Sequence, residues 1–300
     1  MESAIAVRGL TKRYGDLTAV DDVEFSVAPG EFFGILGPNG AGKTTTLELI
    51  EGLRRPDAGS VTLLGESPWP RRREVLNRIG VQLQGSAFFE RLTTREQLST
   101  VASLYAVPGS RVDAMLELVG LTGKAGDRVE KLSGGQRQRL TIACALVHDP
   151  EIVFLDEPTA ALDPQARRNL WDLLEGINHA GRTVVLTTHY MDEAEALCDR
   201  VAIMDHGRVL ELDTPAALVR GLQAPLRVSV VPRALDEGTA RALPGVDEVR
   251  SDAGSLVLTT RDPAGLLSRL AADNELAGLQ VHGASLEDVF LARTGREFRA

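Results

Sequence analysis

Residues 37–45 read GPNGAGKTT, follow the apolar run 32–36, and contain the pattern G-x-x-x-x-G-K-[ST]. Glycines let such a loop curl so that backbone N–H groups point at phosphate oxygens, and a following helix adds its positive dipole end. Lys43 is expected to bridge two phosphates, and Thr44 to give its hydroxyl to Mg²⁺. The residues expected to bind nucleotide here are Gly37, Pro38, Asn39, Gly40, Ala41, Gly42, Lys43, Thr44 and Thr45.

A second apolar run, residues 152–155, ends in two carboxylates, Asp156 and Glu157. Open α/β sheets bind their ligands at the carboxyl ends of strands. Asp156 is expected to coordinate Mg²⁺ directly or through water, and Glu157 to orient and deprotonate an attacking water. Acids also end strands simply by meeting solvent, but the loop at 37–45 favours the catalytic interpretation.

Strands and helices alternate along most of the chain, which predicts a mainly parallel sheet covered on both faces. A mostly helical insertion is expected over 86–147, with a helix N-cap near Glu96. Short strands are expected within 5–36 and over 60–64, 152–155, 183–187 and 200–204, with helices over 44–53 and 164–180. A first domain over 1–220 follows from this pattern.

The remaining residues, 221–300, predict a small α+β domain. Residues 226–231 and 255–260 alternate as strands do, 263–272 has a helical pattern, and 278–281 is a possible third strand. Ser285 is expected to cap a final helix, with Asp288 completing a capping box.

Composition narrows the possible partners of the chain. Its net charge of -9 over 300 residues opposes binding to nucleic acid or to anionic lipid. Cys144 and Cys198 are far apart in sequence, so we expect buried free thiols in a reducing cytosol. The sequence has neither an N-terminal signal-type segment nor an apolar run long enough to span a bilayer. If the protein serves transport, another chain is expected to form the pore.

Residues 132–140, LSGGQRQRL, combine a potential helix N-cap, two glycines and a polar helix start. The pentapeptide LSGGQ, lying between the loop at 37–45 and IVFLDEP, resembles the ATP-binding cassette (ABC) family over roughly residues 3–220. The resemblance implies a P-loop NTPase (RecA-like) α/β core with an antiparallel β subdomain and an inserted helical subdomain. It also implies ATP hydrolysis, with ATP and Mg²⁺ as cofactors.

Further roles come from the resemblance, position by position. Tyr14 matches the aromatic residue that stacks on adenine. Gln84, rather than Gln82, matches the glutamine that faces the metal, the water and the membrane partner. Asp163 matches the aspartate of the loop that follows IVFLDEP. His189 matches the switch histidine that contacts the γ-phosphate.

The family also implies an assembly. Two cassettes face each other head to tail, so Ser133, Gly134, Gly135 and Gln136 of one subunit would contact the ATP held by the other. We expect a homodimer of cassettes on the cytoplasmic face of the cell membrane, attached through an integral-membrane permease subunit. Residues 285–297, SLEDVFLARTGRE, resemble the ABC-2, daunorubicin-type drug-resistance exporters, which favours export.

Two other functions use a similar cassette. ATPases that act on DNA insert long coiled coils or zinc-binding cysteines between the two nucleotide motifs, and neither occurs over residues 46–151. ATPases that act on the ribosome typically carry two cassettes in one chain, whereas this chain has one. The sequence therefore favours the transporter ATPase over these alternatives.

Overall fold

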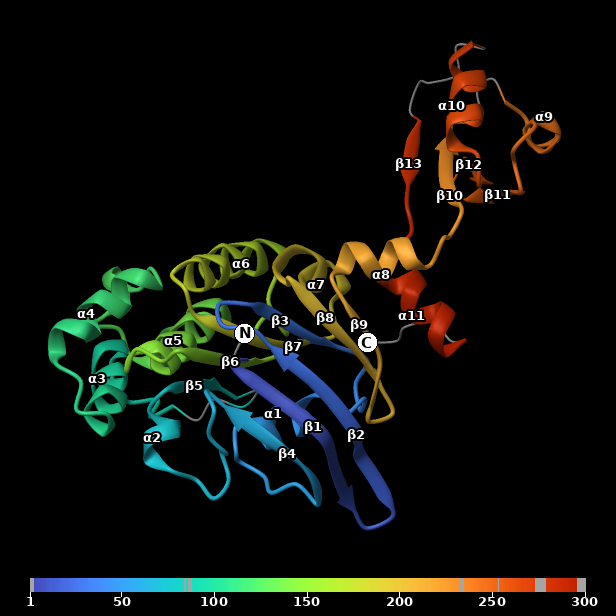
Figure 1. The fold of residues 1–300 in the computed structure, drawn as a ribbon. Coiled ribbons are helices and arrows are strands. Elements are labelled where there is room, and N and C mark those ends of the chain that lie inside the picture. The colour runs from blue at the N-terminus through green and yellow to red at the C-terminus, as the bar shows by residue number, and fades with distance from the viewer. Residues whose placement is uncertain are drawn as a thin grey trace. The chain divides into compact units, whose positions relative to one another are not determined.

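The computed structural model describes residues 3–83, 85, 88–231, 235–252, 254–272 and 279–295. The chain folds into two compact units, the first formed by residues 1–215 and the second beginning at Ala216. Figure 1 labels the helices and strands of both units. Among the described residues, no helix combines the length and apolarity needed to cross a lipid bilayer.

A six-stranded sheet with the order β5-β6-β7-β3-β8-β9 forms the centre of the first unit. All neighbours are parallel except β9, which pairs antiparallel with β8. Every residue of β3, β6 and β7 is buried, as expected for apolar strands covered on both faces. The strands are β3 (Phe32–Leu36), β5 (Ile79–Gln82), β6 (Ile152–Asp156), β7 (Thr183–Thr188), β8 (Arg200–Asp205) and β9 (Arg208–Asp213).

An antiparallel sheet with the order β2-β1-β4 packs beside the central sheet. Its strands are β1 (Ile5–Tyr14), β2 (Leu17–Val27) and β4 (Ala58–Leu63). The expectation of short strands over 5–36 was wrong for the first two, which are 10 and 11 residues long. β1 and β2 stay paired with each other through several register shifts. Local irregularities in the sequence pattern therefore do not end either strand.

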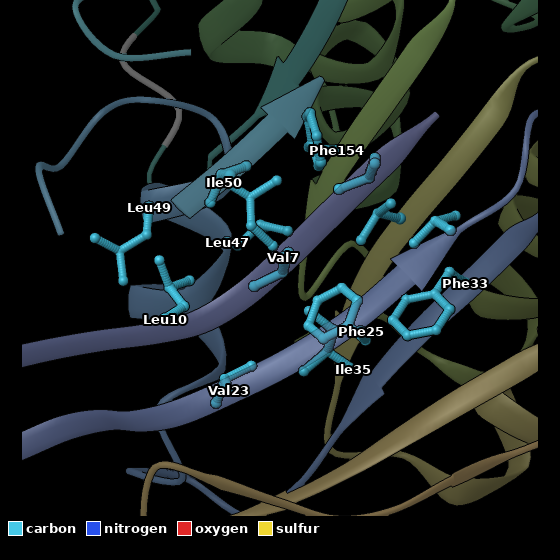
Figure 2. Packing of buried hydrophobic residues seen from close by; sticks show 14 of the residues in the cluster. Val7, Leu10, Val23, Phe25, Phe33, Ile35, Leu47, Leu49, Ile50 and Phe154 are labelled. Atoms are coloured by element: carbon cyan, nitrogen blue, oxygen red, sulfur yellow. The ribbon is translucent and has the colours of Figure 1, made fainter. Parts of the chain in front are cut away.

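One hydrophobic core joins the two sheets around helix α1 (Lys43–Ile50). Figure 2 shows Val23 and Phe25 of β2 facing residues of the central sheet, and the rings of Phe25 and Phe33 stack with centroids 5.0 Å apart. Leu47 and Ile50 of α1 are almost wholly buried in the same cluster. The core therefore fixes the start of α1 against the carboxyl ends of the central strands.

The other helices of the first unit lie over the sheet or form the insertion. Figure 1 shows α6 and α7 on the opposite side of the central sheet from α1. Thr93 caps α3 and Ser133 caps α5, in agreement with the N-caps expected near Glu96 and within 132–140. Both caps are capping boxes, completed by Glu96 and Gln136. The helices are α2 (Arg73–Leu76), α3 (Thr94–Leu104), α4 (Gly109–Leu118), α5 (Gly134–Leu146), α6 (Pro164–His179) and α7 (Met191–Leu197), with short 3-10 turns at Thr122–Lys124 and Val129–Lys131.

The second unit is a β-α-β-β-α-β arrangement with a four-stranded antiparallel sheet in the order β11-β12-β10-β13. Its final helix begins after Ser285, with the predicted capping box from Asp288, and buries Val289 and Phe290. The elements from the unit boundary onward are α8 (Pro215–Gly221), β10 (Leu226–Val230), α9 (Glu237–Ala242), β11 (Glu248–Asp252), β12 (Ser255–Thr260), α10 (Pro263–Ala272), β13 (Gln280–His282) and α11 (Leu286–Thr294).

The two cysteines do not form a disulfide. Cys198 is buried, as expected, and Cys144 is half-buried as a whole residue. Removal from water raises the pKa of the Cys144 thiol to about 12.

Candidate active site

The loop at residues 37–45 passes so close to neighbouring backbone that Gly37 and Gly42 have no room for side chains. A Cβ atom on Gly37 would lie 2.4 Å from the carbonyl oxygen of Met204. On Gly42 it would lie 2.4 Å from the carbonyl oxygen of Ala19, and the backbone of Gly42 has a φ of 100°. The glycines therefore allow the chain to turn directly from β3 into the N-terminus of α1.

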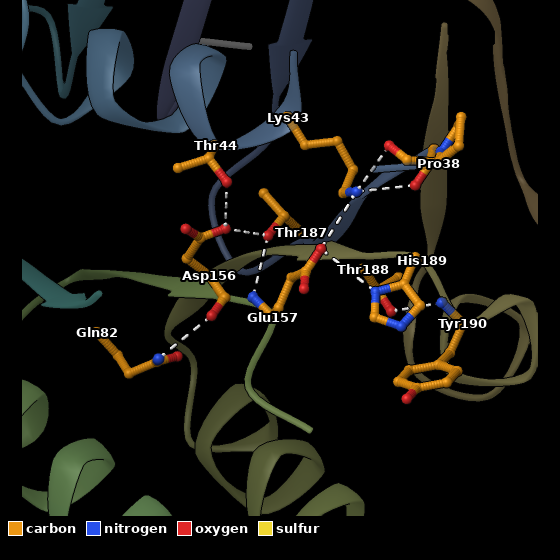
Figure 3. Close-up of polar contacts among 11 residues, drawn as sticks. Pro38, Lys43, Thr44, Gln82, Asp156, Glu157, Thr187, Thr188, His189 and Tyr190 are labelled. Atoms are coloured by element: carbon orange, nitrogen blue, oxygen red, sulfur yellow. Dashed lines mark hydrogen bonds and ion pairs between the residues drawn. The ribbon is translucent and has the colours of Figure 1, made fainter. Parts of the chain in front are cut away.

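Lys43 is a buried cation held across this loop. Its Nζ donates to the carbonyl oxygens of Gly37 at 2.8 Å and Pro38 at 3.2 Å, and lies 3.2 Å from Oε1 of Glu157 (Figure 3). Burial lowers the pKa of Lys43, and the nearby Glu157 and Asp156 partly oppose that shift. The side chain is thus positioned where a loop of this type binds phosphate.

Asp156 sits at the end of β6 among hydroxyl groups from two other elements. Oγ1 of Thr44, from α1, donates to Oδ1 of Asp156 at 3.2 Å, and the hydroxyl of Thr187, from β7, donates to the same oxygen (Figure 3). Gln82 donates from Nε2 to the backbone oxygen of Asp156 at 3.3 Å. Burial is the largest influence on this carboxyl and raises its pKa, against the effect of the hydroxyl groups.

Glu157 and His189 extend from neighbouring strand ends toward each other. Oε1 of Glu157 lies 3.3 Å from Nδ1 of His189, and the same oxygen contacts Lys43 (Figure 3). The backbone of Glu157 has a positive φ of 46° and donates its N–H to Oγ1 of Thr187 at 3.0 Å. A non-glycine residue in this conformation is uncommon and occurs often at functional sites. Here the turn directs the carboxylate back toward the phosphate loop.

A pocket of about 440 Å³ opens beside the loop, a volume typical of small-molecule sites. Tyr14, predicted to stack on adenine, lines it with 41% of its side chain exposed. The cations of Lys12 and Arg54 lie 5.6 and 5.7 Å from its ring centroid. The pocket is lined by Tyr14, Leu17, Thr18, Ala19, Asn39, Gly40, Gly42, Lys43, Thr44, Thr45, Glu157, His206 and Gly207.

Several residues predicted to bind nucleotide do not line this pocket. Among the described residues, neither Ser133–Gln136 nor Asp163 belongs to the lining of this pocket. Ser133 begins α5, where its backbone N–H donates to Oε1 of Gln136 at 3.0 Å. Asp163 caps α6 by accepting from the backbone N–H of Ala166 at 2.9 Å. Gln84 is outside the described residues.

Sequence reasoning missed several residues of the site. Thr187 and Gln82 both contact Asp156, and both lie at or next to the ends of strands that flank β6 in the sheet. A rule that examines every polar residue at a parallel strand end would have found them. No such signal exists for His206 and Gly207, because the turn between β8 and β9 reaches the pocket only through the fold.

Comparisons with known proteins identify relatives over nearly the whole chain. A family model described as ABC transporter matches residues 20–160. The chain is 41% identical over 306 residues to the Nod factor export ATP-binding protein I of Paraburkholderia xenovorans, covering 99% of each chain. It is 39% identical over 304 residues to the protein of that name from Ralstonia nicotianae, covering 98% of this chain and 95% of the relative.

Solved structures with a similar fold are also ATP-binding subunits of ABC transporters. A structure described as the ATP binding subunit of an ABC transporter matches with a TM-score of 0.66 and 27% identity, covering 73% of this chain and 93% of the other. The cbiO1 protein of Clostridium perfringens, described as part of the transporter complex cbiONQ, also gives 0.66 and 27%, covering 74% and 95%. The predicted α/β fold with a P-loop NTPase core is confirmed.

Proposed function

Because the chain belongs to the family of ABC transporter ATP-binding proteins, we propose that it drives export through a separate membrane permease subunit. As a member of this family it binds ATP and is an ATPase. The observation that carries the proposal is the convergence of Lys43, Asp156, Glu157 and His189 at one edge of the sheet beside a pocket of suitable size. The direction of transport rests on the export function named in both relatives, and on the resemblance of residues 285–297 to ABC-2 exporters.

Different residues of the site bind the nucleotide and catalyse its hydrolysis. Backbone N–H groups of 37–45 and Lys43 bind the phosphates, and Tyr14 stacks on the adenine. The γ-phosphate takes the place of Glu157 beside Lys43, because both are anions competing for one buried cation. Glu157 is then free to accept a proton from the attacking water, and His189 contacts the γ-phosphate.

Magnesium fits the oxygen donors at the end of β6. The Thr44 hydroxyl and the Asp156 carboxylate lie in hydrogen-bond contact, and hard oxygen ligands of this kind suit Mg²⁺. We assign these two residues, with Gln84, as those that hold the ion. Bound there, the ion would neutralise charge that develops on the β- and γ-phosphates.

Hydrolysis uses a second copy of the chain. Ser133, Gly134, Gly135 and Gln136 form a helix start that does not line the pocket of their own subunit, although such a start suits an anion. In a head-to-tail pair each copy brings this helix start to the ATP of the other, and Asp163 lies along the same interface. A symmetric homodimer is the simplest assembly.

The permease attaches the assembly to the cytoplasmic face of the cell membrane. A net charge of -9 argues against nucleic acid as an alternative partner. Cross-linking from Leu83, which is 44% exposed, during purification from membranes tests this assignment. Recovery of a polytopic membrane protein is expected, whereas recovery of ribosomes or DNA would contradict it.

A further inference from the structure

The imidazole of His189 reaches the nucleotide site without a hydrogen bond at its buried nitrogen. Nδ1 has no hydrogen-bond partner among the described residues, although Oε1 of Glu157 lies 3.3 Å away. In functional histidines, a hydrogen bond to one ring nitrogen commonly fixes the state and orientation of the ring. A different kind of contact is therefore needed to hold this imidazole in place.

Tyr190 supplies such a contact through its ring. The ring centroids of His189 and Tyr190 lie 4.1 Å apart with an interplanar angle of 41°, and Figure 3 shows the two rings against each other. The backbone N–H of Tyr190 donates to Oγ1 of Thr188 at 2.9 Å, which ties the tyrosine backbone to the end of β7. Aromatic rings in contact favour particular mutual orientations. The tyrosine ring therefore limits the rotation of the imidazole.

Arg167, in the first turn of α6, lies over the ring of Tyr190. Its Cζ atom is 3.9 Å from the ring centroid, well inside the range of a cation–π contact. Nε of Arg167 is buried and has no hydrogen-bond partner in the described part of the chain. Its Nη1 lies 3.5 Å from Oδ2 of Asp192, whose side chain is 61% exposed. The guanidinium thus has a buried contact with the ring and an exposed contact with a carboxylate.

A buried hydrogen bond joins the two helices that carry these residues. Nε1 of Trp171 in α6 donates to Oε1 of Glu193 in α7 at 3.1 Å, and Glu193 is fully buried. Trp171 follows Arg167 by four residues, so both side chains lie on one face of α6. Glu193 follows Tyr190, the N-cap of α7, by three residues. The hydrogen bond therefore holds the guanidinium and the tyrosine ring at a fixed separation.

We propose that Tyr190 and Arg167 are positioning residues for the imidazole of His189. The inference rests on the proposed function, in which His189 contacts the γ-phosphate. Tyr190 restrains the imidazole, and Arg167 restrains the tyrosine ring. Neither residue lines the nucleotide pocket in the described part of the chain. Misplacing a catalytic group by about 1 Å can lower a rate by about 10²-fold, so loss of the restraint should act on kcat.

Steady-state ATP hydrolysis by the full-length chain tests the ring contact. Tyr190→Leu is expected to lower kcat by about tenfold to 10²-fold and to keep KM within about twofold, because it removes the ring but leaves the nucleotide pocket intact. Tyr190→Phe keeps the ring and should hold kcat within about twofold of wild type. An unchanged kcat in Tyr190→Leu, or equal losses in Tyr190→Leu and Tyr190→Phe, would overturn the proposal.

Arg167→Gln tests the second contact, and it also serves if Tyr190→Leu does not fold. Loss of the cation over the ring is expected to lower kcat by at least about twofold. Asp192→Asn is the matched control, because it removes the exposed ion pair but leaves the guanidinium over the ring. If Asp192→Asn lowers kcat as much as Arg167→Gln, the ion pair is responsible and Arg167 does not have the proposed role.

A double-mutant cycle separates positioning from a general loss of structure. A residue that acts through His189 should matter little once the imidazole has been removed. Under single-turnover conditions, Tyr190→Leu should change the rate by less than about twofold in a His189→Ala background, in contrast to its effect on wild type. Equal factors in the two backgrounds would show that Tyr190 acts independently of His189, and would overturn the proposal.

The same cycle distinguishes this inference from the proposed function. An active wild type, an impaired His189→Ala and an unchanged Tyr190→Leu would overturn the positioning role alone. No ATP hydrolysis by wild type, or full activity in His189→Ala, would contradict the role assigned to the site and the positioning role with it.

Discussion

Lys43 and Glu157 pair with each other at 3.2 Å in the nucleotide pocket, so the cation and the general base are coupled before ATP arrives. A buried lysine next to two carbonyl oxygens and a carboxylate is positioned for an anion that replaces the carboxylate. Binding and catalysis then depend on separate members of the pair. Substitution of each member should therefore give a different defect.

Lys43→Ala should abolish tight ATP binding, because the phosphates lose their fixed cationic partner and keep only the backbone N–H groups. Nucleotide titration measures this directly. Lys124→Ala is a suitable control, since Lys124 pairs with Asp127 at the surface. Near-normal affinity in Lys43→Ala would mean that residues 37–45 are not the phosphate site.

Glu157→Gln should lower the ATPase rate by about 10²- to 10⁴-fold while ATP binding survives, because the amide keeps the size of the side chain but cannot accept the proton. Glu151→Gln, at the opposite end of the same strand region and paired with Arg78, should turn over normally. An unchanged rate in Glu157→Gln would remove Glu157 from the role of base.

Sequence patterns identified residues whose position follows from one strand or one loop. The sequence alone predicts that Lys43, Asp156 and Glu157 lie close together, because parallel strands end at the same edge of a sheet. Thr187 escaped because a polar residue near a strand end is common and carries no motif. Gln82 was considered but set aside in favour of Gln84, and its contact with Asp156 appears only in the structure. The positive φ of Glu157, which turns its carboxylate toward Lys43, has no signature in the sequence.

Gly42→Ala should disturb the start of α1, because an alanine would need a left-handed backbone and would meet the carbonyl oxygen of Ala19. A loss of about 1–3 kcal/mol in the free energy of unfolding is expected from the strain alone. Denaturant unfolding measures it. Gly123→Ala has open space and should change stability little, so equal stability of the two variants would contradict the geometry.

Ser133→Arg should leave ATP binding by the monomer nearly intact and block hydrolysis, since Ser133 is proposed to contact ATP in the opposite subunit. The change also removes the cap of α5, a loss of about 1 kcal/mol. Thr93→Arg removes the equivalent capping box of α3 and controls for that loss. If the two variants hydrolyse ATP equally, or Ser133→Arg loses binding in parallel with turnover, the composite site is wrong.

Helices and strands with strong local signals were predicted well, and those defined by pairing were not. The N-cap expected within 132–140 and the capping box expected at Ser285 are both present, because a cap depends on residues three positions apart. β11 and α9 went unpredicted, since a polar five-residue strand and a six-residue helix carry little periodicity. Contacts with neighbouring strands and helices, rather than local sequence propensity, determine whether such short elements form.

The chain as a whole holds what we propose to be two halves of different ATP sites. One half is the pocket with Lys43 and Glu157, and the other is the helix start at Ser133, outside that pocket. The sequence could indicate this division only through family resemblance, because no pattern within one chain specifies a contact between two. The described residues that line the pocket all belong to the first unit.

The most direct test of the composite site is the association state of Glu157→Gln with ATP and Mg²⁺, measured by size-exclusion chromatography with light scattering. Removing the base should trap the ATP-bound state, and one negative charge fewer beside the γ-phosphate lessens repulsion. We predict a dimer with ATP and a monomer without it, while Glu157→Gln combined with Ser133→Arg stays monomeric. A Glu157→Gln chain that binds ATP fully and remains monomeric would contradict the account.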